Sequence, residues 1–320
     1  MNKNFKVDVP VMLFIFVRPH TLTKVFEVIS DVKPSVLFLV SDGPRENVPT
    51  DKEKILKSRE VVDTIDWDCE VHRLYSDTNQ GMYETERMAR EYAFKYVDRL
   101  ILLEDDVIPS KSFFKFCGEL LEEYKDDYRI NRICGMNHLG VYKEPSSDYF
   151  FSKEGSIWGY AIWKRTHENY DYSFHYSEDK YTIKRLMENT LKGKKMKAKY
   201  LNFPKGIFVD GKRPGPEFFL SSACELYHQL NIVSSINLVK NIGVGQESTN
   251  SGKEYRLLPK GIRRVFNMET YEHSFPLQHP KYVIEDRRYL KKVYRIMGWG
   301  HPLVILYRKI EIFLRKRIWR

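Results

Sequence analysis

The chain has 320 residues and a mass of 38.2 kDa, which suits one large α/β domain or two smaller ones. Apolar residues make up 42% and aromatic residues 14%, so the composition excludes an intrinsically disordered chain. The longest purely apolar run, residues 11–17, is far shorter than the roughly 20 residues of a membrane-spanning helix. The polar N-terminal residues predict no secretory signal peptide.

Charge and cysteines narrow the class of protein further. The net charge is +10, and residues 281–320 alone carry twelve Lys/Arg against three acids, a net +9. This concentration argues against a general nucleic-acid coat and predicts a basic tail with a single role. The four cysteines lack CxxC spacing, so neither a zinc site nor a disulfide framework is expected, and we predict a cytoplasmic protein.

Strand-like and helix-like segments alternate through the first 124 residues. Apolar runs predict strands, and helical spacing or a capping residue, Ser110 in one case, predicts helices between them. Such alternation predicts an α/β fold with a mainly parallel sheet covered by helices on both faces. The predicted strands are 11–17, 36–40, 69–75 and 100–103, and the predicted helices are 20–31, 51–64, 82–97 and 110–124.

The second half of the chain is less regular. Residues 217–230 are predicted as a helix and 231–240 as a pair of short strands. Residues 141–153 and 205–216 contain Pro, Gly and Ser and are predicted as loops. The polar, Gly-rich segment 241–256 is predicted to form a lid or tail.

Three polar clusters fall where predicted strands end: Arg18, Ser41-Asp42-Gly43 and Glu104-Asp105-Asp106. In parallel sheets, ligands bind beyond the carboxyl ends of the strands. The carboxylates are hard oxygen ligands of the kind that Mg²⁺ and Mn²⁺ share with substrate phosphates. The alternative is a solvated acidic turn that precedes the next helix.

The segment around Glu104-Asp105-Asp106 resembles the metal-binding segment of GT-A glycosyltransferases. It is most similar to N-acetylglucosaminyltransferase I and related bacterial family-2-like enzymes, in which Glu-Asp-Asp is followed by a Pro and an aromatic pair. Four more segments resemble the family in the same order, over about residues 10–251. These segments are Phe16-Val17-Arg18-Pro19, Val40-Ser41-Asp42-Gly43, residues 151–163 and residues 237–245.

The resemblance implies a Rossmann-like GT-A domain over residues 1–255 that binds a UDP-sugar, followed by an extension over 256–320. It implies that Arg18 and Asp42 contact the uracil or ribose, and that Asn79 and Gly81 lie near the nucleotide. Without the resemblance, Arg18 is read as a surface residue and Asp42 as part of a turn.

The same resemblance assigns the carboxylates. It implies that Asp106 ligates Mn²⁺ or Mg²⁺, while Glu104 and Asp105 hold the sugar and ribose. A bound metal would neutralise the departing diphosphate.

The aromatic segment that contains Trp158, Gly159, Tyr160 and Trp163 has two interpretations. Trp158 and Gly159 are assigned to sugar and nucleotide binding, with the Trp158 ring as a platform for the sugar. The alternative is a strand whose aromatic side chains pack in the core, which we favour for Trp163.

An inverting transferase needs a carboxylate that takes the proton of the acceptor hydroxyl. The position of the family's base falls on Glu217, which replaces an Asp and lacks the flanking tryptophans. Glu225 is the second candidate, and the alternative for Glu217 is a favourable charge in the first turn of a helix. Asn250 stands where relatives have a His, a further departure from the family.

In residues 301–320, apolar residues follow helical spacing beside Arg and Lys, with Trp319 near the end. A basic amphipathic helix of this kind suits an anionic membrane surface. The alternative is a terminal helix that docks on its own domain through the same apolar stripe.

These observations predict a metal-dependent inverting glycosyltransferase at the inner face of the membrane. We expect it to use a UDP-sugar and a saccharide or lipid-linked acceptor in the synthesis of a bacterial surface polysaccharide. We expect it to bind no nucleic acid. The first alternative is a non-catalytic membrane- or polyanion-binding protein on the same scaffold. The second is a sugar-1-phosphate nucleotidyltransferase, disfavoured because Arg18-Pro19-His20 lacks the expected Gly-rich loop.

Overall fold

The structure is a computed structural model that describes residues 8–208, 213–244 and 255–318. Most of the lid or tail predicted at 241–256, including Asn250, lies outside the described residues, as does Trp319.

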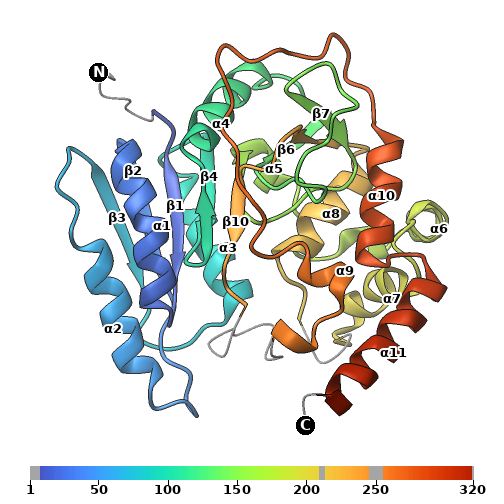
Figure 1. The fold of residues 1–320 in the computed structure, drawn as a ribbon, viewed down its shortest axis with the longest axis horizontal. Coiled ribbons are helices and arrows are strands. Elements are labelled where there is room, and N and C mark those ends of the chain that lie inside the picture. The colour runs from blue at the N-terminus through green and yellow to red at the C-terminus, as the bar shows by residue number, and fades with distance from the viewer. Residues whose placement is uncertain (1–7, 209–212, 245–254, 319–320) are drawn as a thin grey trace.

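Eight strands of the described chain form one central sheet in the order β3-β2-β1-β4-β8-β6-β9-β7 (Figure 1). All of them run parallel except β8 and β7, which are antiparallel to their neighbours. The predicted mainly parallel α/β sheet is therefore confirmed. The strands are β1 Val11–Ile15, β2 Val36–Ser41, β3 Glu70–Tyr75, β4 Arg99–Glu104, β6 Ile130–Cys134, β7 Tyr149–Ser152, β8 Tyr160–Trp163 and β9 Leu230–Ser234.

A second, antiparallel pair joins β5 (Val107–Pro109) to β10 (Val239–Asn241). β5 begins three residues after the end of β4, so its pairing with β10 brings the segment after Asn241 next to Asp106. The Asp106 carbonyl accepts a hydrogen bond from the Ile242 N–H at 2.9 Å.

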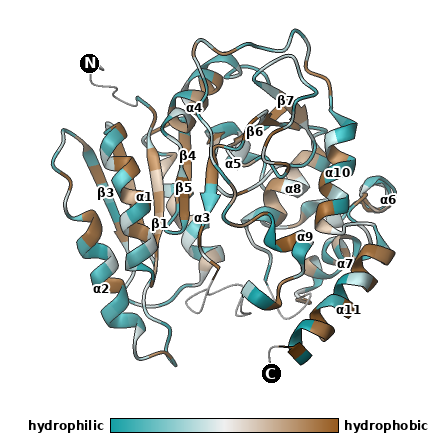
Figure 2. Cartoon of the chain, viewed as in Figure 1, coloured by the Kyte–Doolittle hydropathy of each residue, from teal (hydrophilic) through white to brown (hydrophobic). Residues whose placement is uncertain are grey.

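Helices cover both faces of the sheet. The helices are α1 Pro19–Val32, α2 Asp51–Val62, α3 Met82–Ala93, α4 Lys111–Glu123, α5 Lys164–Glu168, α6 Lys180–Asn189, α7 Lys194–Asn202, α8 Pro216–Leu226, α9 Lys260–Arg263, α10 Arg287–Met297 and α11 Pro302–Ile318. Alternate residues of β1 explain its continuous apolar run: Leu13 packs in the core beneath α1 and α4, and Met12 in the core beneath α3 and α8. In Figure 2, β1 and β4 are mainly brown, whereas helices such as α1 and α2 alternate between brown and teal along their length.

Two strands depart from the predictions. Residues 141–153 were predicted as a loop, but β7 occupies Tyr149–Ser152 at the edge of the sheet. A four-residue run behind Pro145 and two serines is too short to show strand alternation. β6 was also not predicted, because Asn131 and Arg132 interrupt its apolar pattern although both are buried.

The segment between residues 255 and 297 packs on the sheet. Val265 and Leu277 belong to the core beneath α4, and Tyr289 of α10 is buried against Phe150 of β7. The Glu272 carboxylate accepts hydrogen bonds from the first backbone N–H groups of α4, at 3.1 Å from Lys111 and 2.7 Å from Ser112. This distant glutamate caps the helix, whereas the side chain of Ser110, at the predicted N-cap position, makes no capping hydrogen bond.

Helix α11 lies at the edge of the molecule (Figure 1), and none of its described residues is buried. Its contacts with the rest of the chain are largely polar: Arg308 donates to the carbonyl of Ile296, and Glu311 accepts from the Lys260 N–H at 2.9 Å. All of its larger apolar side chains except Ile312, which is half-buried, are 45–80% exposed. Across the described residues, no helix combines the length and apolar character needed to cross a membrane.

Candidate functional site

A cavity of about 250 Å³ opens at the carboxyl ends of β1, β2 and β4. In the sheet, β1 lies between β2 and β4. The strands that follow β1 in the chain, β2 and β3, lie on one side of it, and β4 lies on the other. The cavity therefore lies where the strand order reverses. Six residues assigned to the site from the sequence line it: Arg18, Asp42, Asn79, Gly81, Glu104 and Asp105.

Arg18 and the acidic triplet form one charged cluster. The Arg18 guanidinium donates from Nη1 to Asp105 Oδ1 at 3.0 Å and also contacts Asp106 Oδ2. The second oxygen of Asp105 accepts from the Phe16 N–H at 2.9 Å. Arg18 therefore lies between the two aspartates and holds them at the end of β1.

The carboxylates of this cluster resist ionisation. Burial raises the pKa of Asp105 to about 7, although the Arg18 charge opposes the shift. Burial also raises the pKa of Glu104, with further contributions from the neighbouring carboxylates, and that of Asp106. Burial thus favours the neutral form of these carboxylic acids, and an additional positive charge nearby would favour their ionised form.

Asp42 organises the loop that forms one wall of the cavity. Its Oδ1 accepts from the N–H groups of Gly43 and Gln80, both at 2.8 Å. Its Oδ2 accepts from the Asn79 side chain at 3.0 Å and the Gly81 N–H at 2.9 Å. With four donors on two oxygens, Asp42 fixes the position of the loop that carries Asn79 and Gly81.

Gly43 and Gly81 in this wall are required for different physical reasons. A Cβ at Gly43 would lie 2.4 Å from the backbone of Thr78, so no larger residue fits there. Gly81 has open space around it but a φ of +79° immediately before α3, a conformation that L side chains rarely adopt.

A metal ion fits this cluster only together with other ligands. Asp106 Oδ1 is buried and has no hydrogen-bond partner among the described residues, so one oxygen remains for a cation. In the described chain, no group of three or more His, Cys, Asp or Glu side chains is arranged to hold a metal by itself, and this includes the acidic triplet. Mg²⁺ commonly takes one or two carboxylates and completes its shell with water and substrate phosphates. The residues present therefore suit a cation that arrives with a diphosphate.

Gly243 is a site residue that the sequence reasoning missed. It follows β10, and a Cβ there would overlap with the Asp106 carboxylate. The Asn241 side chain holds this turn by accepting from the Gly243 N–H at 3.0 Å. The segment was recognised as a motif, but only the pairing of β10 with β5 shows that it covers Asp106.

A second cavity, of about 410 Å³, lies beside the first and contains Trp158 and Glu217. A third, of about 570 Å³, connects the two, since it shares Gly81 and Met82 with the first and Lys195 and Glu217 with the second. Trp158 is half-buried, with its ring 4.9 Å from that of Phe266. The structure therefore places Trp158 in the second cavity and not beside the predicted nucleotide site.

Gly159 and Trp163 have packing roles. Gly159 has a φ of +59°, and a Cβ there would lie 2.6 Å from the Val239 side chain. Trp163 is buried in β8, and its indole N–H donates to the Leu121 carbonyl at 2.9 Å. Neither residue lines either of the two cavities.

The two candidate bases differ in their surroundings. Glu217 is exposed in the first turn of α8 and lines the second and third cavities. Glu225 is half-buried, lies 3.4 Å from Lys153 and lines neither cavity. The geometry thus favours Glu217 as the carboxylate that a ligand can reach.

Glu86 is a second residue that the sequence reasoning missed. It is buried on α3, 3.0 Å from Arg90, and one of its oxygens has no hydrogen-bond partner among the described residues. Burial raises its pKa to about 7, against the effect of Arg90, and the charge of Glu217 adds to the shift. The sequence offers one indication of this ion pair, the spacing of four residues between Glu86 and Arg90. The same spacing is typical of exposed ion pairs on helices, so it does not indicate burial.

No known family profile matches the chain, and no curated protein matches it in sequence.

Proposed function

We propose that the protein is a metal-dependent inverting glycosyltransferase of the GT-A type that moves a sugar from a UDP-sugar to a saccharide or lipid-linked acceptor. The observation that carries this proposal is the convergence of Arg18, Asp42, Glu104 and Asp105 on one cavity at the switch point of the sheet. Asp106 does not line the cavity but contacts Arg18 beside it. That is where α/β folds of this kind bind nucleotides.

The nucleoside would occupy the cavity between β1, β2 and the loop held by Asp42. Glu104 and Asp105 line this cavity and would accept hydrogen bonds from ribose and sugar hydroxyls. Asp106 would hold Mn²⁺ or Mg²⁺ with the diphosphate, and the ion would supply positive charge as the diphosphate leaves. Arg18 would shift from the aspartates toward the phosphates, because an arginine binds both groups in the same fork geometry.

Glu217 would act as the base, taking the proton of the acceptor hydroxyl as its oxygen attacks the anomeric carbon. Glu217 lines the second and third cavities, which supports a role between a donor in the first cavity and an acceptor in the second. The reaction forms the acceptor–sugar bond, breaks the bond between the sugar and UDP, and leaves the proton on Glu217.

Helix α11 supports a peripheral location at the inner face of a membrane. Its exposed apolar side chains, from Leu303 to Ile318, lie next to Lys309, Lys316 and Arg317. Apolar and basic groups together bind the headgroup region of anionic lipids. Such a location fits an enzyme of surface polysaccharide synthesis whose acceptors are lipid-linked.

A transfer assay tests the proposal. The full chain is incubated with a panel of UDP-sugars and Mn²⁺, and UDP release is measured with and without saccharide acceptors. We expect turnover with at least one donor, and a decrease in kcat of roughly 100-fold or more for Glu217→Gln with an unchanged KM for the donor. Glu225→Gln is the matched control and keeps wild-type activity.

Two outcomes would contradict this account. Wild-type activity in Glu217→Gln would remove Glu217 as the base. Absence of turnover together with absence of UDP binding would favour the alternative of a non-catalytic membrane- or polyanion-binding protein on this scaffold.

A further inference from the structure

The second cavity is rich in positive charge. Its lining includes Arg132, Lys192, Lys195 and Lys199 but only two carboxylates, Glu154 and Glu217. A cavity with this excess attracts an anionic ligand.

Arg132 is the most informative of these cations. It is 2% exposed, and no carboxylate of the described residues lies within ion-pairing distance of it. Its Nη2 donates to the Gly155 carbonyl at 3.0 Å and its Nη1 to the Asn131 side chain at 3.3 Å, while its Nε has no partner in the described part of the chain. A buried guanidinium without a counter-ion is costly unless an anion compensates it.

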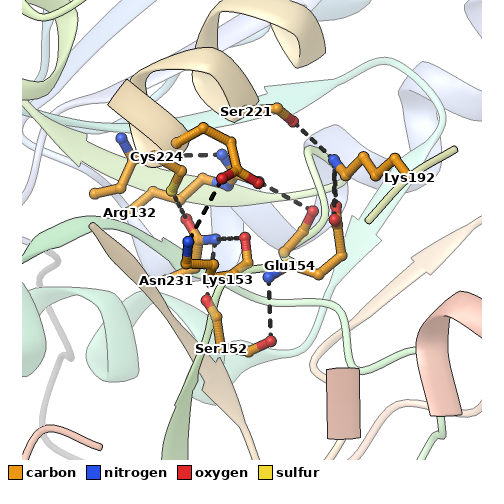
Figure 3. Close-up of polar contacts among 11 residues, drawn as sticks. Arg132, Ser152, Lys153, Glu154, Lys192, Ser221, Cys224 and Asn231 are labelled. Atoms are coloured by element: carbon orange, nitrogen blue, oxygen red, sulfur yellow. Dashed lines mark hydrogen bonds and ion pairs between the residues drawn. The ribbon is translucent and has the colours of Figure 1, made fainter. Parts of the chain in front are cut away.

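Lys192 forms the other side of the same polar cluster (Figure 3). Its ammonium lies 2.9 Å from Glu154 and 3.1 Å from the hydroxyl of Ser221, and 4.9 Å from the centre of the Trp299 ring. Glu154 pairs with Lys192, and its charge also helps to raise the pKa of Arg132 against the effect of burial. One carboxylate is thus shared by two cations.

His138 also lines the cavity, and the positive charges there affect its pKa. Burial lowers its pKa to about 4, and the charges of Lys192 and Arg132 contribute to the shift. The imidazole thus stays neutral beside the cations, as expected where the local potential is positive.

Two further lysines stand at the passage from the third cavity. Lys195 and Lys199 lie one turn apart on α7 and line both the second and third cavities, as does Glu217. Trp158 and Trp299 provide flat apolar surfaces in the same cavity. The second cavity thus combines space for a sugar, two indole rings and a cluster of cations beside Glu217, the candidate base.

We propose that the second cavity binds the acceptor and that it selects an acceptor saccharide carrying a phosphate group. This inference rests on the proposed function, since it assigns the substrate class of the same site. Arginine and lysine together recognise phosphate oxygens, and the indole rings contact the sugar. The phosphate belongs either to a soluble sugar phosphate or to a lipid-linked one. Trp299, which lines the cavity, lies three residues before the start of α11, the helix proposed to bind the membrane.

Calorimetry on the full chain tests the proposal. Glucose 1-phosphate and glucose are titrated separately in the presence of saturating UDP and Mn²⁺, so that the first cavity is filled. We expect glucose 1-phosphate to bind at least about tenfold more tightly than glucose, because hydrogen bonds between charged groups and a phosphate are stronger than those to a neutral hydroxyl. Lys195→Gln/Lys199→Gln should remove that difference, while the control Lys194→Gln/Lys197→Gln, on residues of the same helix that do not line the cavity, should keep it.

A second arm distinguishes the sources of phosphate. Phosphatidylcholine vesicles are prepared with and without a polyprenyl phosphate, and binding is measured by co-sedimentation. Binding that depends on the polyprenyl phosphate and is lost in Lys195→Gln/Lys199→Gln supports a lipid-linked acceptor. Binding of glucose 1-phosphate without such vesicle binding supports a soluble one.

Separate results overturn the two proposals. Equal or absent binding of glucose and glucose 1-phosphate would refute the phosphate-selective cavity. A loss of UDP affinity in Lys195→Gln/Lys199→Gln would assign these lysines to the donor and refute it as well. If UDP fails to bind the wild type but glucose 1-phosphate still binds in its absence, the glycosyltransferase proposal fails, and with it the acceptor role of the cavity.

Discussion

Asp42 illustrates how a single side chain at a strand end can shape a binding site without necessarily touching a ligand. Its two oxygens accept four hydrogen bonds from Gly43 and from residues 79–81. The sequence predicted a polar turn at this position, but the four donors come largely from a loop nearly forty residues further along the chain. Local sequence patterns cannot predict such convergence.

Replacing Asp42 by Asn tests this positioning role. An Asn amide would place N–H groups against two of the present donors, so we expect the free energy of unfolding to fall by about 1–3 kcal/mol. Urea unfolding measures this, with the exposed, surface-paired Asp63→Asn as the control. A variant with wild-type stability but weaker UDP binding would instead make Asp42 a direct ligand.

His138 gives the protein a predictable sensitivity to acid. Its folded-state pKa of about 4 is below the unfolded value of about 6.5, so its contribution to stability is complete above pH 6.5 and is lost as the pH falls toward 4. The full contribution is about 3 kcal/mol. Urea unfolding of His138→Gln should show a shallower loss of stability between pH 6.5 and 4. An unchanged slope, like that expected for the exposed His175→Gln, would contradict this reading.

Buried charges were the hardest residues to predict. Arg132 lies within a strand and Glu86 within a helix, where the sequence offers no sign that either side chain is buried. Their burial depends on helices and loops that are distant in the sequence. The acidic triplet was predictable because it directly follows a run of four apolar strand residues.

At the scale of elements, the parallel strands β1, β2 and β4 were predictable because both faces of the sheet are covered and their sequences are continuously apolar. β6 and β7 were not, because one contains buried polar residues and the other is four residues long. The capping of α4 by Glu272 also lies beyond local sequence patterns, since the two segments are 160 residues apart.

Helix α11 carries a prediction about membranes. Leu306 and Phe313 are 55% and 54% exposed, so Leu306→Ser/Phe313→Ser should leave stability within about 0.5 kcal/mol of the wild type. Binding to vesicles that contain phosphatidylglycerol should fall about tenfold or more, because two apolar side chains no longer enter the interface. Co-sedimentation measures the effect. Equal binding by this variant and by the control Leu56→Ser/Met88→Ser, which alters exposed residues on other helices, would contradict it.

For the whole molecule, the contacts of residues 255–297 predict one cooperative unit. Leu277 is buried in the core of the sheet, and Leu277→Ala should destabilise the chain by about 2–4 kcal/mol. Thermal unfolding should remain a single transition that shifts to lower temperature, while the exposed Leu56→Ala leaves it in place. Two separate transitions, only one of them shifted, would contradict this and would make the predicted extension over residues 256–320 a separate folding unit.

The central claim is that the cluster around Asp106 binds a nucleoside diphosphate together with a divalent cation. Calorimetric titration of UDP, with and without Mn²⁺, on the wild type and on Asp106→Ala tests it most directly; Asp98→Ala, whose side chain is 88% exposed, is the control. The account predicts Mn²⁺-dependent UDP binding that is lost in Asp106→Ala and retained in Asp98→Ala. The absence of UDP binding to the folded wild-type protein, or binding that is unaffected by Asp106→Ala, would contradict it.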